Sequence, residues 1–145
     1  MRLWHHKLLP YLPDAQFKGQ LRELVAIMHD WRDKGQTNHL LINRVMEYQK
    51  GELTDYFAGY CAEYERRYQR HVSISTMCEF REFSVCLHYP VVRPYRDWHN
   101  DTYLRICMAN LFEKHLGVGK SRITDEEWQR LLEGYKTITG EDYRI

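Results

Sequence analysis

The amino-acid sequence predicts an all-α fold, a compact single-domain bundle of five or six helices over residues 1–145. Most apolar side chains recur at the 3.6-residue period of a helix, and almost no segment shows the alternation of a strand. The length fits one domain of the usual ~100–200 residues. The composition, 43% hydrophobic and 28% charged with four prolines, is that of an ordinary globular protein.

The first predicted elements are an apolar arm and a long helix. Residues 8–13 carry two prolines, which we expect to prevent a helix through the arm, and Asp14 is a good N-cap. Gly35 stands where a helix over residues 14–34 needs its C-terminal glycine. The apolar stripe of this helix consists of Phe17, Leu21, Leu24, Val25 and Met28.

Three helices are expected in the middle of the chain. Asn38 can cap a helix that ends near Gly51, and the next helix starts at Thr54. We interpret the tyrosine-rich stripe of that helix as core rather than as a platform for stacked bases. Residues 72–88 fit both a short strand and a helix, and we favour the helix.

The last part of the chain predicts a loop and two helices. Two prolines make residues 89–96 a loop, and Asp101 opens a helix that ends at Gly117. The buried face of this helix consists of Leu104, Cys107, Met108, Leu111 and Phe112. Thr124 and Glu127 form the pattern of a capping box at the start of the last helix.

Charge and cysteine content limit the class of protein. The net charge is only +1, so no global field attracts a polyanion. No apolar run is long enough for a membrane helix and the start lacks a signal peptide, so we expect a cytoplasmic protein without a membrane partner. The cysteines lack metal-binding spacing, and we expect reduced, mostly buried thiols at Cys61, Cys78, Cys86 and Cys107.

The candidate chemical groups are histidines and one charged pair. Neighbouring side chains diverge on a strand, so we expect no metal at His5 and His6. We also expect no cofactor. We interpret His39, His99 and His115 as capping or core histidines. Arg22 and Glu23 interrupt an apolar period, so they lie at the border of the buried stripe. They form either a solvated ion pair or a partly buried acid beside a binding cleft.

Several motifs together resemble one known family. Arg22-Glu23-Leu24, about twenty residues from the start, resembles the first helix of the pyrimidine-dimer DNA glycosylases, the endonuclease V-like family. The opening Met1-Arg2-Leu3-Trp4-His5 is similar to its bacterial branch. Further similar segments are Leu9-Pro10, Gly19-Gln20, His39, Trp98-His99-Asn100-Asp101, Tyr103-Leu104-Arg105, Asn110-Leu111, Glu113-Lys114 and Glu126-Glu127-Trp128.

The resemblance implies a DNA repair enzyme that acts on damaged double-stranded DNA. Its nucleophile would be the N-terminal amine, which is here that of Met1. This amine would replace the damaged base on the sugar and form an imine, and β-elimination would then cleave the strand. Glu23 would be the catalytic acid beside Arg22. The residues expected to contact DNA are Arg2, Lys18, His39 and Lys114, with Arg22 also on a phosphate.

The chain departs from the family pattern at a few positions. The bulky Arg2 is expected to leave Met1 in place, ahead of the family's nucleophile position. Gln16 stands where the family has a histidine, and Ala26 and Asn110 stand where it has arginines. Because duplex affinity grows with the number of neutralised phosphates, we expect weak DNA binding.

Two other functions remain open from the sequence. One is a non-catalytic nucleic-acid-binding helical module that uses Arg66, Arg67, Arg70, Arg93 and Arg96. The other is an enzyme with a small substrate that uses Glu23 with His39 or His99. In each case we expect a monomer.

Overall fold

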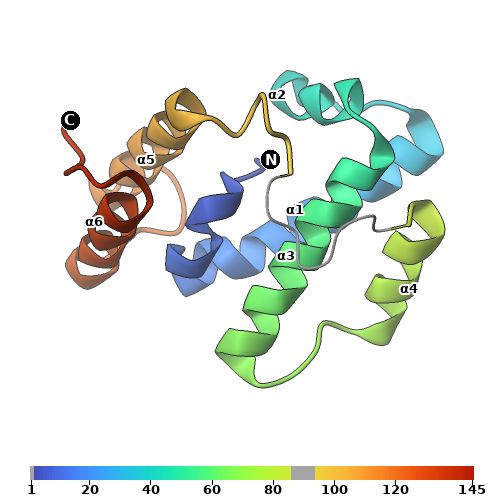
Figure 1. The fold of residues 1–145 in the computed structure, drawn as a ribbon, viewed down its shortest axis with the longest axis horizontal. Helices are drawn as coiled ribbons and strands as arrows, with labels where there is room; N and C mark the ends of the chain where they lie inside the picture. The colour runs from blue at the N-terminus through green and yellow to red at the C-terminus, as the bar shows by residue number, and fades with distance from the viewer. Residues whose placement is uncertain (1, 86–93) are drawn as a thin grey trace. The chain divides into compact units, whose positions relative to one another are not determined.

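The computed structural model describes residues 2–85 and 94–145. Over these ranges the chain forms six α-helices and two short 3₁₀ helices and no strand, which confirms the all-α prediction (Figure 1). Each helix in the described ranges is too short or too polar to cross a membrane. Met1, Cys86, Arg93 and most of the predicted loop at 89–96 lie outside the described residues.

Contacts between Cα atoms divide the chain into two compact units. Unit 1 contains Met1–Leu3 and Gln20–Arg96, and unit 2 contains Trp4–Gly19 and Asp97–Ile145. Helix α1 (Asp14–Lys34), predicted at these bounds, contributes residues to both units. The single-domain organisation therefore stays a prediction.

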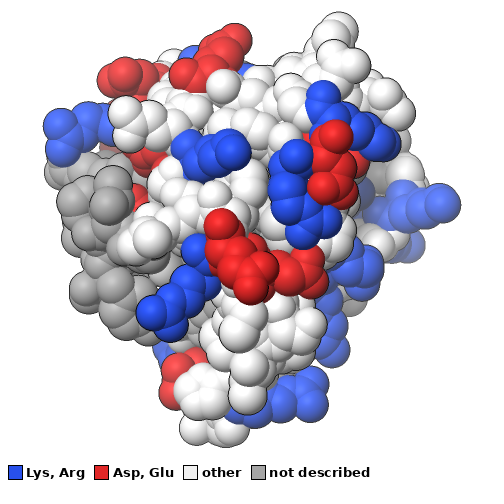
Figure 2. Space-filling model, turned by 90° about the vertical axis from the view of Figure 1, so that its right-hand side faces the viewer, with Lys and Arg blue, Asp and Glu red and all other residues white. Residues whose placement is uncertain are grey.

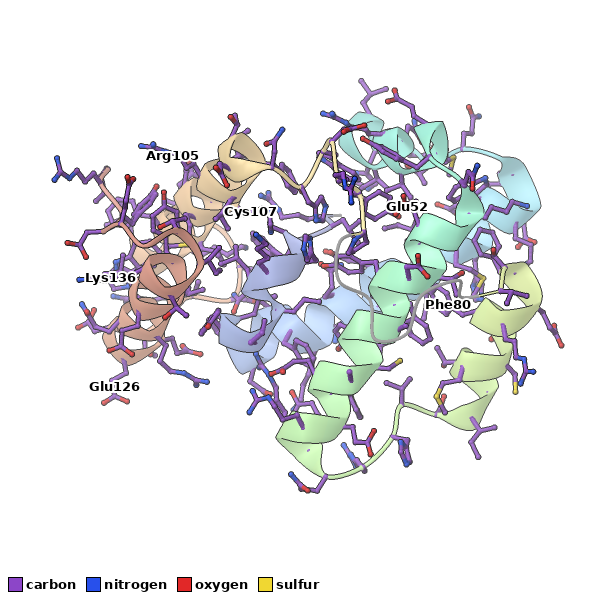
Figure 3. All side chains as sticks on the ribbon, in the orientation of Figure 1. Glu52, Phe80, Arg105, Cys107, Glu126 and Lys136 are labelled. Carbon is purple, nitrogen blue, oxygen red and sulfur yellow. The ribbon has the colours of Figure 1, made fainter. Side chains whose placement is uncertain are left out.

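Unit 1 holds the second part of α1 and the central helices. These are α2 (Leu40–Asn43), the 3₁₀ helix η2 (Arg44–Glu47), α3 (Lys50–Tyr68) and α4 (Ile74–Phe83). Phe80 of α4, labelled in Figure 3, stacks on Phe57 of α3 with ring centroids 3.8 Å apart. Tyr60 is fully buried. The stripe on α3 is therefore core at these positions, and residues 74–83 form the favoured helix.

The prediction of one helix from Asn38 to near Gly51 is wrong in extent, because the observed α-helix covers only Leu40–Asn43. The Asn43 side chain accepts hydrogen bonds from the Thr37 backbone N–H at 2.8 Å and from the Thr37 hydroxyl at 3.0 Å. Asparagine side chains that bind nearby backbone groups compete with a regular helix, and here only one turn, α2, forms before η2. Gly51 lies in the first turn of α3 rather than beyond a helix end.

Unit 2 contains η1 (His6–Tyr11), the start of α1, α5 (Asp101–His115) and α6 (Asp125–Thr139), and α5 packs beside α6 (Figure 1). The Thr124–Glu127 capping box is present as predicted. Leu104, Cys107, Met108 and Leu111 are buried, also as predicted.

The prediction that prolines prevent a helix before residue 14 is wrong. Residues 6–11 form the 3₁₀ helix η1 with Pro10 inside it. The Leu8 N–H donates to the His5 carbonyl at 2.9 Å, and the Leu12 N–H donates to the Leu8 carbonyl at 3.0 Å. A helix this short needs few backbone donors, so the missing N–H of a proline near its end costs little.

The described cysteines are free thiols, but they are less buried than predicted. Cys107 is buried, Cys61 is half-buried and Cys78 is exposed. The exposure of Cys78 corrects the expectation of mostly buried thiols, because only one side of α4 is covered. Burial raises the pKa of Cys61 to about 12, so this thiol stays protonated at neutral pH.

A glycine in α6 provides a test of the packing of unit 2. A Cβ at Gly134 would lie 2.3–2.7 Å from three ring atoms of Tyr11, so the ring would have to move. We expect Gly134→Ala to lower the free energy of unfolding by about 1–3 kcal/mol, although alanine is the better helix former. Gly59→Ala in α3, with no atom within 4 Å of its Cβ, is expected to raise it by up to about 1 kcal/mol. Chemical denaturation measures the free energy of unfolding of both variants. If Gly134→Ala were as stable as Gly59→Ala, the result would contradict the packing of Tyr11 against Gly134.

Candidate active site

Glu23 lies on α1 at the edge of the buried face and is half-buried. Burial raises the pKa of its carboxyl above the ordinary value, while the Arg2 backbone N–H and the positive charges of Arg2 and Arg22 oppose this effect. Arg22 itself is exposed. Of the two interpretations of this charged pair, the structure therefore favours the partly buried acid over the solvated ion pair.

Two hydrogen bonds with α1 hold the backbone of Arg2 beside Glu23. The backbone N–H of Arg2 donates to Glu23 Oε2 at 3.0 Å. The backbone carbonyl of Arg2 accepts from Gln20 Nε2 at 2.8 Å. Residues 20 and 23 are three apart and share one face of the helix, so α1 binds both polar groups of residue 2. This arrangement fixes the backbone of Arg2 relative to the Glu23 carboxyl.

Gln20 is a site residue to which the sequence analysis assigned no role, although Gly19-Gln20 is one of the segments similar to the family. Its side chain is fully buried, and its Oε1 accepts a hydrogen bond from the Tyr56 hydroxyl of α3 at 3.3 Å. Gln20 lies between Phe17 and Leu24 on the apolar stripe of α1. A polar residue inside an apolar stripe needs a buried hydrogen-bond partner, and this was the signal available in the sequence.

The other predicted site residues lie in both units. Arg2, Arg22, Glu23 and His39 belong to unit 1, and Lys18 and Lys114 belong to unit 2. His39 is exposed just before α2. Lys18 is exposed and pairs with Asp14 at 2.9 Å, and Lys114 Nζ donates to the Lys120 carbonyl at 3.1 Å. The structure brings Arg2 and Glu23 together, and the DNA contacts of the others stay predictions.

The residues at two departures from the family pattern make contacts within the protein. Gln16 is buried, and its Nε2 donates to the Ser121 carbonyl at 2.8 Å. Asn110 Nδ2 donates to the Ile106 carbonyl one turn earlier on α5 at 2.9 Å. Both side-chain amides therefore support the local structure of unit 2.

The arginines of the alternative binding module are partly engaged inside unit 1. Glu63 is buried, and its carboxylate accepts from Arg66 Nε at 2.8 Å and from Arg67 Nε at 2.9 Å. Arg66 and Arg67 are thus paired with an acid, and Arg93 lies outside the described residues. On the face shown in Figure 2, basic and acidic side chains are interspersed. The pairing of Arg66 and Arg67 with Glu63 weakens the case for a duplex-binding surface built on these arginines.

Comparison with known proteins identifies the family. Neither the curated proteins nor the solved structures gave a significant match. A family model described as pyrimidine dimer DNA glycosylase matches residues 1–76, slightly more than half of the 145 residues. The matched region includes Arg2, Gln20 and Glu23 and therefore the contacts described above. The chain belongs to the pyrimidine dimer DNA glycosylase family.

Proposed function

We propose that the protein is a DNA glycosylase with abasic-site lyase activity on damaged pyrimidines in double-stranded DNA. The α-amine at the start of the chain attacks the sugar C1′, and the bond from C1′ to the base breaks. The sugar ring then opens at its C1′–O4′ bond as the imine forms and the nitrogen loses a proton. Removal of a C2′ proton breaks the C3′–O bond to the phosphate by β-elimination, which cleaves the strand. The contact of the Arg2 backbone nitrogen with Glu23 at 3.0 Å, in a chain of this family, carries the proposal.

Glu23 has two roles in this reaction. Its carboxylate stabilises the positive charge that develops on the sugar and then moves the proton that β-elimination requires. Partial burial strengthens its electrostatic effect, because water screens it less. Arg22 is exposed beside it and binds a phosphate. Further DNA contacts come from Arg2, Lys18, His39 and Lys114.

The amine is that of Met1 in a chain that keeps this residue. An α-amine titrates near ~8, well below a lysine, so a useful fraction is neutral at physiological pH. In a chain that has lost Met1, the Arg2 nitrogen next to Glu23 becomes the amine itself. In one form the amine belongs to Arg2, which contacts Glu23, and in the other it belongs to the residue directly before Arg2 in the sequence. The mass of the covalent adduct distinguishes the two forms.

Borohydride trapping on a duplex with one abasic site tests the proposal. Borohydride reduces the imine and leaves protein and DNA covalently joined, which only an amine nucleophile allows. We expect one adduct per chain, with the DNA on the first residue by peptide mass spectrometry. Salt-sensitive duplex binding without an adduct would overturn the proposal and favour the non-catalytic binding module.

Gln20 is a positioning residue in this scheme. Gln20→Met keeps the size of the side chain but removes its hydrogen bond to the Arg2 carbonyl. We expect the single-turnover trapping rate to fall about tenfold, because a small displacement of a reacting group slows reaction strongly. Tyr56→Phe keeps the Gln20–Arg2 bond and should change the rate less than threefold, about the effect of a weak hydrogen bond. Equal rates for both variants would contradict the role of Gln20.

A further inference from the structure

Three histidines from distant parts of the sequence meet in unit 2. His5 precedes η1, His6 is its first residue, and His99 lies just before α5. The rings of His5 and His6 stack with centroids 4.9 Å apart, and the His99 ring lies 5.1 Å from His5 and 5.6 Å from His6. The expectation that neighbouring histidines diverge is wrong here, because the segment turns into a 3₁₀ helix instead of extending as a strand.

The ring nitrogens of these histidines are close enough to share one ion. One nitrogen from each ring lies within 4.8 Å of the other two. The Nδ1 atoms of His6 and His99 are 3.4 Å apart. Two nitrogens bound tetrahedrally to Zn²⁺ at ~2.0–2.1 Å are separated by about 3.4 Å. This pair therefore already has the spacing of two zinc ligands.

Hydrogen bonds fix the tautomers of two of the rings. His5 Nε2 lies 2.9 Å from the His99 carbonyl, which can only accept, so Nε2 carries the proton and Nδ1 carries a lone pair. Metal-bound histidines commonly donate their second N–H to a carbonyl in this way. His99 Nδ1 accepts from the His6 backbone N–H at 3.1 Å, so it also carries a lone pair. His5 Nδ1 accepts from the Lys7 N–H at 3.2 Å.

The three rings differ in burial. His5 and His99 are buried. His6 is only half-buried, so an ion can reach the cluster from solvent.

We propose that His5, His6 and His99 bind one divalent transition-metal ion of the Zn²⁺ class. Imidazole nitrogens suit such ions, and three protein ligands leave a fourth position for water. Binding exchanges the weak backbone hydrogen bonds at two Nδ1 atoms for metal–nitrogen bonds. The ion then links η1 to the segment before α5, across more than ninety residues of sequence. This inference is independent of the proposed glycosylase activity.

Metal titration of the untagged full chain tests this site. After treatment with a chelator, we expect calorimetry to detect one Zn²⁺ per chain, and the thermal midpoint to rise when Zn²⁺ is added. Co²⁺ in place of Zn²⁺ should give the intense visible bands of tetrahedral coordination. We expect His6→Ala to weaken Zn²⁺ binding at least tenfold, because it removes a ligand and keeps the backbone N–H that binds His99.

His71→Ala is the matched control, because His71 is exposed in unit 1 and lies outside the cluster. This variant should bind Zn²⁺ as the wild type does. A folded wild type that binds no Zn²⁺ would overturn the proposal. Equal Zn²⁺ affinity of folded His6→Ala and wild type would also overturn it, since the ion would then occupy another place. Circular dichroism of each variant confirms that it is folded.

Discussion

Glu23→Gln is expected to lower the rate of base excision more than a hundredfold while the protein stays folded. The substitution keeps the size of the side chain, and its amide oxygen can still accept from the Arg2 backbone N–H. It removes the negative charge that stabilises the positive sugar, and it removes the group that moves the proton. A general acid or base contributes about 10²–10⁴ in rate, and the electrostatic effect adds to this.

Excision from a duplex that contains a pyrimidine dimer measures this effect, together with the thermal midpoint of each variant. Glu82→Gln on α4 is the matched control, since Glu82 is exposed and outside the proposed site. We expect the control to excise at the wild-type rate. Unchanged excision in Glu23→Gln would assign Glu23 a structural role and remove the main support for the mechanism.

The raised pKa of Glu23 adds a pH dependence to this prediction. Burial favours the protonated carboxyl in the folded protein, so the folded state binds this proton more tightly than the unfolded state does. The contribution of Glu23 to stability therefore falls as pH rises through its pKa. Glu23→Gln should be at least as stable as the wild type at neutral pH. As pH falls, excision by the wild type should decline through the pKa of Glu23, which lies above the ordinary pKa of a glutamate side chain.

The sequence predicted best those helices whose signals are local. Helix α1 matches its predicted bounds, because its start at Asp14 and its end before Gly35 are marked by neighbouring residues. The capping box at Thr124 marks α6 in the same way. The helix predicted after residue 38 was wrong in extent because the Asn43–Thr37 contact depends on the fold of a loop. A periodicity of apolar residues does not contain this information.

The candidate site was predicted only in part for a similar reason. The family motif and the interrupted apolar stripe pointed to Glu23. The contact of Glu23 with Arg2 joins residues 21 positions apart, and the role of Gln20 depends on Tyr56, 36 positions away. The histidine cluster joins residues more than ninety positions apart. Such pairings follow from tertiary packing, which one sequence without its structure does not specify.

Blocking the N-terminal amine is expected to remove the borohydride adduct completely. An acetylated α-amine has no basic lone pair and cannot form an imine. Acylation at mildly acidic pH favours the α-amine over lysine side chains, because lysines titrate more than two pH units higher. The modified chain should still bind an abasic-site duplex, since every side chain proposed to contact DNA is unchanged. Adduct yield and duplex affinity are measured on the same sample.

Lys7→Ala tests whether the nucleophile is the α-amine or Lys7, the lysine nearest to the start of the sequence. Lys7 is exposed and has no proposed contact with DNA, so this variant should form the adduct as the wild type does. Loss of the adduct in Lys7→Ala, with trapping retained in the acetylated chain, would make Lys7 the nucleophile. Loss only in the acetylated chain would assign the imine to the first residue. Because α1 holds Arg2 through Gln20 and Glu23, we expect the second result.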